Sequence, residues 1–293
     1  IVLFMVVIGY ATLINKSTSI ISTVENYDLS VWLNTNEESV SEAFYQKVAK
    51  IDGVQNYSLV TRFGGIVDKS LLINEPINDG SNNENVKIVV FDDNSLGKYL
   101  RTLGLSTDSL NSDSIPSVVL INKGITYDPI DQTAYETTYL NAKENDLIDV
   151  AYKTGETDQA GNELDPIINK LKIALITDQY PLGVDNSADM AILVISRKTS
   201  HELFGKMITN ATMFIKSDNP NLVESKARAI YDEKPIGQLF VQNFKAFNDE
   251  AKRNLQTLFL FFYIFVGIIS AISIMNILNS IYTTIMNRRR ELA

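Results

Sequence analysis

The sequence predicts an α+β protein in which a domain outside a membrane lies between two transmembrane helices. Three observations predict this fold class. An apolar run of membrane-spanning length lies near one end, a shorter apolar run opens the chain, and strand and helix patterns alternate between them. The domain is expected to have a split β-α-β subdomain, built from both ends of this region, and an inserted β-rich subdomain.

The longer apolar run extends from Leu255 to Met275 and contains only a few polar residues. About 20 such residues cross a hydrocarbon core of roughly 30 Å. A surface helix of a soluble protein normally has a polar stripe, and this run has none. We therefore expect a transmembrane helix over 255–283.

The opening run, from Ile1 to Ile14, is equally apolar but too short to cross a membrane alone. The core of a signal peptide and a buried helix are alternative interpretations. We favour the end of a first transmembrane helix over 1–14, followed by a stalk over 15–26. The sequence then represents a segment of a longer protein.

Three arginines, Arg288, Arg289 and Arg290, follow the second run. Short loops rich in Lys and Arg stay in the cytoplasm. Residues 284–293 are therefore expected to start a cytoplasmic segment, and residues from about 15 to 254 to be extracellular, in a multi-pass protein of the cell membrane. The formal net charge is −9, and an acidic exterior argues against a nucleic-acid partner. Solubility and recognition of a cationic ligand both remain explanations of the charge.

Two β-α units flank the extracellular region. A strand pattern at 27–34 precedes a helix pattern that ends near Gly53, and a further strand follows at 55–63. A second strand at 210–217 precedes another helix, with Asp218 or Asn219 as its N-cap. The split α+β subdomain is therefore predicted over 27–63 and 208–236.

The region between these units, 64–207, is the predicted β-rich insertion. It contains several apolar strand runs and one short helix over 94–104, and its polar loops carry Gly and Pro. Beyond the second unit, 237–254 is predicted to be a stalk helix that continues into the span. Apolar residues recur at helical spacing along this segment and into the span, at Phe240, Phe244, Phe247, Ala251 and Leu255. These residues could pair with the other helix or pack on the underside of the domain.

The residues that catalysis or metal binding would need are scarce. Cysteine is absent, which excludes disulfides and thiolate chemistry and fits a bacterial source. His201 is the only histidine, and its place at a predicted helix start favours a solvated or capping role. The pair Asp92 and Asp93 fits a helix cap better than acid–base work. No phosphate-binding loop is present. We therefore expect no catalytic, cofactor or metal site.

The second span ends in a segment that contains Asn276, Ser280, Arg288, Arg289, Arg290, Glu291, Leu292 and Ala293. These residues resemble a motif of the FtsX/MacB-type permeases of ABC transporters. The order of span, split outer domain, stalk and span is also similar to that family.

The resemblance implies a porter-like split subdomain and a coupling role for Asn276, Ser280 and the residues from Arg288 to Glu291. It implies an ATP-binding ABC subunit as partner, so that ATP is bound there and this chain has no cofactor. It also implies contact with membrane lipid, and either a permease dimer or an internally duplicated permease. The expected function is export, or mechanical work on the outer face, with a peptide, antibiotic or lipid-type substrate.

Two other functions remain open at this point. A two-span extracellular sensor could bind a ligand and signal to a cytoplasmic domain after Arg290. An enzyme anchored on the outer surface is a third possibility, and the lack of a plausible catalytic set counts against it.

Overall fold

The computed structural model describes residues 26–291, except 36, 74–83, 112–114, 129–132, 154–163, 185–189 and 206–210. The chain divides into two compact units, one formed by 24–245 and the other by 1–23 with 246–293. Each unit is described by itself. The predicted first span (1–14) and all but the last residue of the first stalk (15–26) lie outside the described residues.

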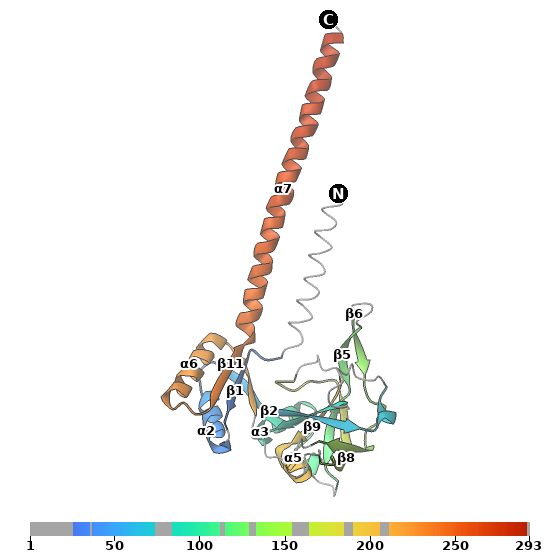
Figure 1. Ribbon diagram of the computed structural model, residues 1–293, viewed down its shortest axis with the longest axis vertical. Coiled ribbons are helices and arrows are strands. Elements are labelled where there is room, and N and C mark those ends of the chain that lie inside the picture. The colour runs from blue at the N-terminus through green and yellow to red at the C-terminus, as the bar shows by residue number, and fades with distance from the viewer. Residues whose placement is uncertain are drawn as a thin grey trace. The chain divides into compact units, whose positions relative to one another are not determined.

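Within the described part of 24–245, one nine-stranded sheet has the order β11-β1-β10-β2-β3-β9-β4-β8-β7 (Figure 1). Its strands are β1 (Leu29–Asn34), β2 (Val54–Val67), β3 (Val86–Phe91), β4 (Ser117–Ile121), β7 (Leu147–Tyr152), β8 (Ile167–Thr177), β9 (Ala191–Ser196), β10 (Thr212–Ser217) and β11 (Gln238–Asn243). A separate hairpin consists of β5 (Lys123–Asp128) and β6 (Thr133–Thr138). The helices are α2 (Glu38–Val48), η1 (Lys69–Leu71), α3 (Asp93–Thr102), α4 (Asp108–Asn111), α5 (Arg197–Phe204), α6 (Pro220–Glu233) and α7 (Phe244–Glu291).

The two β-α units meet in space as the sequence predicts. Strand β1 pairs with β10, β10 pairs with β2, and α2 and α6 pack together beside β1 and β11 (Figure 1). Alternate residues of β1 (Leu29, Val31 and Leu33) point into a core shared with both helices. Asn219 is the N-cap of α6, and its side chain accepts a hydrogen bond from the backbone N–H of Leu222. The predicted cap is confirmed.

The insertion closes into a six-stranded barrel, which the sequence analysis did not predict. Residues 60–65 of β2 pair with β3, and its last two residues, Ile66 and Val67, pair with β7. The circuit β2-β3-β9-β4-β8-β7 is therefore closed. Alternate residues of these strands, such as Ile88, Leu193 and Val150, fill the interior. Phe204 of α5 packs against Phe63 and Tyr152 in the same core.

The outer face of β3, β9 and β4 forms a second core with α3 and α4. Asp92 caps α3, accepting hydrogen bonds from the backbone N–H groups of Asn94 and Ser95. A capping role is therefore confirmed for Asp92, whereas the prediction of Asp93 or Asn94 as the cap is wrong, because the helix begins at Asp93, one residue earlier than predicted. Strand β2 takes part in both the barrel and the split subdomain, so one sheet joins the two.

The stalk prediction is wrong at its start. Residues 238–243 form β11, which pairs antiparallel with β1, and α7 begins only at Phe244. Phe240 therefore belongs to a strand, and its ring stacks on Trp32 with centroids 4.9 Å apart. Gly237 precedes the strand with φ of 74°, and a Cβ there would lie 2.0 Å from the backbone oxygen of Asn34. This close approach requires glycine and turns the chain from α6 into β11.

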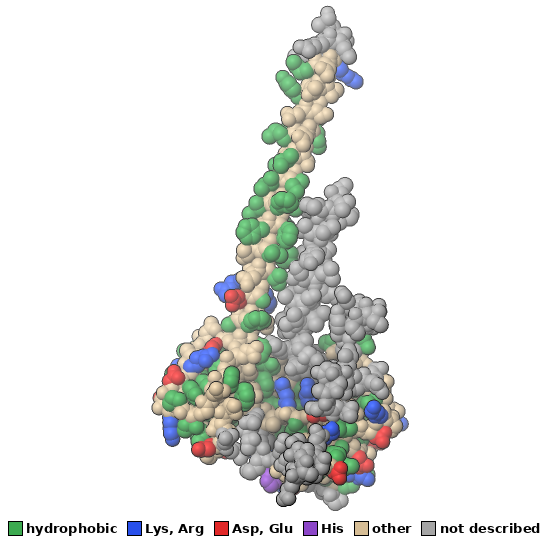
Figure 2. Space-filling model, viewed as in Figure 1, with side chains coloured by type: hydrophobic (Ala, Val, Ile, Leu, Met, Phe, Trp, Pro, Cys, Tyr) green, Lys and Arg blue, Asp and Glu red, His purple; other side chains and the backbone are tan. Residues whose placement is uncertain are grey.

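Helix α7 is 48 residues long and contains one candidate membrane span, Phe244–Arg288, whose most apolar 18-residue window has a mean hydropathy of 2.5. None of its most apolar window is buried within the described protein. Hydrophobic side chains cover much of its length (Figure 2). Length, composition and exposure are consistent with the predicted second span.

Candidate functional site

The candidate site is the place where β1 and α7 begin and β10 ends. We call it the β1–α7 joint, and it comprises Asn26, Tyr27, Asp28, Phe244 and Lys245. All five residues belong to the unit 24–245. Asn26, Tyr27 and Asp28 lie at the start of this unit, and Phe244 and Lys245 lie at its end.

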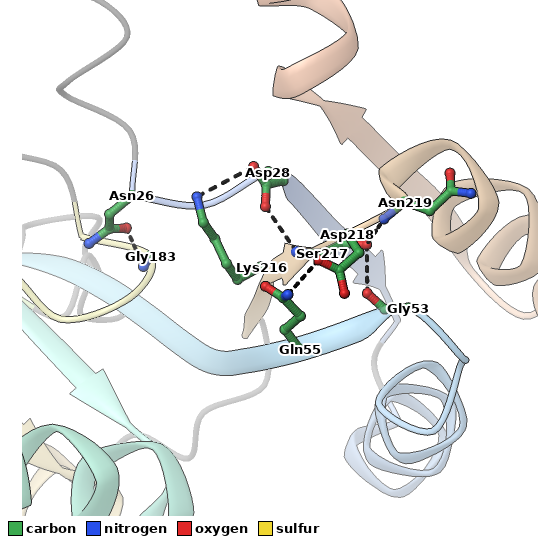
Figure 3. A network of polar contacts seen from close by, with 9 residues as sticks. All are labelled: Asn26, Asp28, Gly53, Gln55, Gly183, Lys216, Ser217, Asp218 and Asn219. Carbon is green, nitrogen blue, oxygen red and sulfur yellow. Dashed lines mark hydrogen bonds and ion pairs between the residues drawn. The ribbon is translucent and has the colours of Figure 1, made fainter.

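Asp28 connects three segments of the chain at this joint. Its backbone oxygen accepts hydrogen bonds from the N–H groups of Phe244, at 2.9 Å, and Lys245, at 3.3 Å. Its carboxylate accepts one from the N–H of Ser217, at 2.9 Å, and lies 3.4 Å from Nζ of Lys216 (Figure 3). The first N–H groups of a helix have no partner inside the helix. Asp28 satisfies two of them in α7 while holding the end of β10.

Aromatic packing joins the same segments. The ring of Tyr27 packs edge to face against the rings of Phe214 and Phe244. The ring centroids are 4.6 Å apart for Phe214 and 5.0 Å apart for Phe244. The guanidinium of Arg62 lies over Phe214, 4.8 Å from the ring centroid. Tyr27 and Phe214 are buried, and Phe244 is half-buried against the same core. The first residue of α7 is therefore packed against the core of the domain.

A short loop, residues 180–184, covers this aromatic group. The side chain of Asn26 donates hydrogen bonds to the backbone oxygens of Pro181, at 2.7 Å, and Val184, at 3.2 Å. It also accepts one from the N–H of Gly183, at 2.9 Å (Figure 3). The oxygen of Gly183 also accepts a hydrogen bond from Arg62. A Cβ at Gly183 would lie 2.5 Å from the Phe214 ring. The loop can approach the ring this closely only because residue 183 is glycine.

The other end of the polar network ties β10 to the helix–strand corner before β2. The hydroxyl of Ser217 donates to the backbone oxygen of Gly53, at 2.8 Å, and accepts from the N–H of Asn219, at 3.1 Å. Asp218 accepts a hydrogen bond from Gln55 (Figure 3). The end of β10 is thus held from both sides, by Asp28 and by this corner.

The predicted stalk residues separate into different environments. Phe240 lies in β11, and Phe244 lies in the joint. Ala251 is half-buried, and the side chain of Phe247 is 67% exposed. The structure therefore supports a contact role for Phe244. Pairing of the stalk with the first helix stays a prediction, because its partners there lie outside the described residues.

The predicted coupling residues lie in the second half of α7. Asn276, Ser280 and Arg288 are exposed. The backbones of Arg289, Arg290 and Glu291 continue the helix, and their side chains lie outside the described part. Their role in coupling stays a prediction. The contacts of Asn26 and Asp28 were not predicted, although two polar residues immediately before a buried strand were a signal.

The contacts of the joint are aromatic packing, one ion pair and hydrogen bonds to backbone groups. Among the described residues, no group of three His, Asp or Glu side chains could hold a metal ion. His201 is exposed in α5, where its backbone oxygen accepts the hydrogen bond from Gly205 that ends the helix. The hydrogen bonds and ring contacts of the joint connect the residues before β1 with the end of β10 and with the first residues of α7.

No family model and no curated protein matches the chain. Solved structures similar to it include the periplasmic region of MacB from Actinobacillus actinomycetemcomitans, at 12% identity and a TM-score of 0.39, covering 80% of this chain and 95% of that one. The extracellular domain of the noncanonic ABC-type transporter YknZ from Gram-positive bacteria is similar at 10% identity and a TM-score of 0.36, covering 74% and 100%.

Proposed function

We propose that this chain belongs to the permease subunit of an FtsX/MacB-type ABC transporter. A separate subunit binds and hydrolyses ATP, and this chain transmits the resulting motion to the outer face of the membrane. The work done there is export or mechanical work, on a peptide, antibiotic or lipid-type substrate. In this proposal the chain has no catalytic site of its own.

The observation that carries the proposal is the attachment of α7 to the domain at Asp28 and Tyr27. A membrane anchor needs only a flexible linker between its span and the domain. Here β11 leads directly into α7 at Phe244, and the first two helical N–H groups are bonded to the start of β1. A displacement of the helix start therefore acts on β1 and β10 without an intervening flexible segment.

The far end of α7 supports the same proposal. The helix is continuous from Phe244 to Glu291, so it connects the joint with the segment that carries Asn276, Ser280 and the arginines. That segment resembles the inner end of the second helix in FtsX/MacB-type permeases. An ATPase subunit docked there would have a helix through which to move the joint.

The test uses the full-length protein together with its ATPase subunit in lipid nanodiscs, with hydrogen exchange as the readout. We expect ATP to change the exchange of amides in β1 and β10. Phe244→Asp should abolish this ATP-dependent change, because a charge cannot remain packed against Tyr27. Ile168→Asp is the matched control, since Ile168 lies in β8 outside the joint, is 65% exposed and should leave the change intact.

A second variant separates coupling from folding. Phe244→Leu keeps an apolar side chain in the joint, so the ATP-dependent change should be largely retained. If Phe244→Asp responds to ATP like the unmodified protein, the joint does not transmit the motion. If no ATPase subunit associates with the full-length protein, and a kinase- or cyclase-like domain follows the span instead, the chain is a two-span receptor.

A further inference from the structure

A cavity of about 160 Å³ lies beside the joint, between β2, α3 and the 180–184 loop. Asn56, Tyr57 and Ser58 of β2 form one wall, and Lys98, Tyr99 and Thr102 of α3 form another. Tyr180, Pro181 and Leu182 close it from the side of the loop. The lining is thus mainly aromatic and apolar, with a few polar groups and one cation, as is typical of sites for small organic molecules.

Lys98 is the charged group among the described residues that line this cavity, and none of these residues is Asp or Glu. Its Nζ donates a hydrogen bond to the side-chain oxygen of Asn56, at 3.0 Å, and lies 4.9 Å from the ring centroid of Tyr57. An ammonium group has three N–H donors. Asn56 and Tyr57 therefore hold Nζ of Lys98 in position, and Nζ still has donors for a ligand. Among the described residues, Lys98 forms no ion pair.

The size and lining of the cavity limit the ligand. A protein cavity of about 150 Å³ admits a molecule the size of benzene. Tyr57, Phe91 and Leu182 offer such a body aromatic and apolar contacts. One lysine suits a single negative charge, whereas a phosphate of higher charge calls for more donors. We propose that this cavity binds a small organic carboxylate, with its charge at Lys98 and an apolar body no larger than a benzene ring.

Such a ligand would contact the loop that holds the joint. Pro181 and Leu182 line the cavity, and their backbone oxygens accept hydrogen bonds from Asn26 and Ser58. The hydroxyl of Tyr99, another lining residue, donates to the backbone oxygen of Gln179, at 2.7 Å. Occupation of the cavity therefore restrains the loop from both sides. This inference goes beyond the proposed function, because it needs neither ATP nor the partner subunit.

The experiment measures binding of benzoate to the full chain in lipid nanodiscs by equilibrium dialysis, with empty nanodiscs as background. Lys98→Met should weaken benzoate binding about tenfold or more, as expected for the loss of a charged hydrogen-bond partner. Lys226→Met, which removes an exposed lysine of α6 outside the cavity, should not change it. Benzamide, a neutral molecule of the same size, should bind far more weakly than benzoate.

A second readout is the hydrogen exchange of residues 179–184, which saturating benzoate should slow in the unmodified chain and not in Lys98→Met. Equal benzoate binding by the unmodified chain and Lys98→Met would overturn the assignment. Equal binding of benzoate and benzamide would overturn the carboxylate class. Benzoate binding without slower exchange would overturn the link to the loop. Since no ATPase is present, a failure here leaves the proposed permease function unaffected.

Discussion

Asp28 makes contacts at the joint that no neighbouring residue can replace. Its carboxylate is 14% exposed and bonds to the N–H of Ser217, whereas Lys216, its ion-pair partner, is 45% exposed. We expect Asp28→Ala to lower the free energy of unfolding by about 1–3 kcal/mol, because the buried N–H of Ser217 loses its acceptor. Urea unfolding followed by the fluorescence of Trp32, the single tryptophan, measures this change.

Lys216→Met is the matched control for Asp28. It removes the half-exposed ion pair and keeps the hydrogen bond to Ser217, so its cost should be about 0–1 kcal/mol. Equal costs for the two variants would mean that the ion pair, rather than the backbone contact, holds the end of β10.

The buried hydroxyl of Tyr45 is expected to make the stability of the protein depend on pH in the alkaline range. Its hydroxyl donates to the backbone oxygen of Ala211, at 2.6 Å, and accepts from the N–H of Leu33, at 3.0 Å. Burial raises the pKa of Tyr45 from 10.0 to about 12. The folded state therefore keeps the phenol proton to higher pH than the unfolded state. This contribution to stability is complete below about pH 10 and is lost as the pH rises to about 12.

Tyr45→Phe should remove this alkaline loss and lower stability at neutral pH by about 1–3 kcal/mol, since two backbone groups lose their partner. Urea unfolding at a series of pH values between 8 and 12 (roughly the window set by ordinary and raised tyrosine pKa values) checks both effects. Burial also raises the pKa of Tyr99, so some alkaline dependence should remain in the variant. A slope identical to that of the unmodified protein would contradict the role given to Tyr45.

The contacts of Asp28 could not be predicted from the sequence, because they join residues that are far apart along the chain. The N-cap of α6 was predictable because Asn219 acts on N–H groups only a few residues away. Asp28 acts on Ser217 and Phe244, which are distant in sequence and adjacent only because β1 pairs with both β10 and β11. No local pattern records that pairing.

At the scale of elements, β11 shows how a helical spacing can mislead. Phe240, Phe244 and Phe247 recur at helical intervals, yet Phe240 lies in a strand and only the later two lie in a helix. The residues of β11 alternate between exposed and half-buried in the structure, whereas its sequence, QLFVQN, places three apolar residues in a row and so fits a strand as well as a helix. Pairing with β1 decides between the two patterns, and the sequence alone does not reveal this pairing.

The barrel depends on α5 as well as on its strands. Phe204, at the end of α5, is 3% exposed and packs against Phe63 and Tyr152. Phe204→Ala should lower the free energy of unfolding by about 3–5 kcal/mol, the range for truncating a buried Phe. Amide exchange of β7 and β9 should speed up, since both strands contribute to the core that Phe204 closes.

Leu203→Ala on the same helix is the control for Phe204, because Leu203 is only partly buried against this core. Its cost should be clearly smaller. If the two truncations cost the same, Phe204 does not close the barrel core in the way described.

At the scale of the whole molecule, the order of elements was the most predictable feature. Two β-α units, a strand-rich insertion and an apolar helix were all evident from local patterns, because each element carries its own periodicity. Closure of the insertion into a barrel was not evident, since it depends on the last residues of β2 pairing with β7 far along the chain. The joining of the barrel to the split subdomain through β2 was not evident for the same reason, because it depends on the pairing of β2 with both β10 and β3.

The arginines at the end of α7 are expected to set the orientation of this helix in the membrane. Arg288, Arg289 and Arg290 follow the apolar run, and positive residues beside a span favour the cytoplasmic side. Replacing all three by Glu should move part of the protein to the opposite orientation, detected by labelling a single cysteine introduced in the 180–184 loop from outside intact cells. Replacement by three lysines keeps the charge and should preserve full labelling. If the glutamate variant is labelled as completely as the lysine variant, the arginines do not set the orientation.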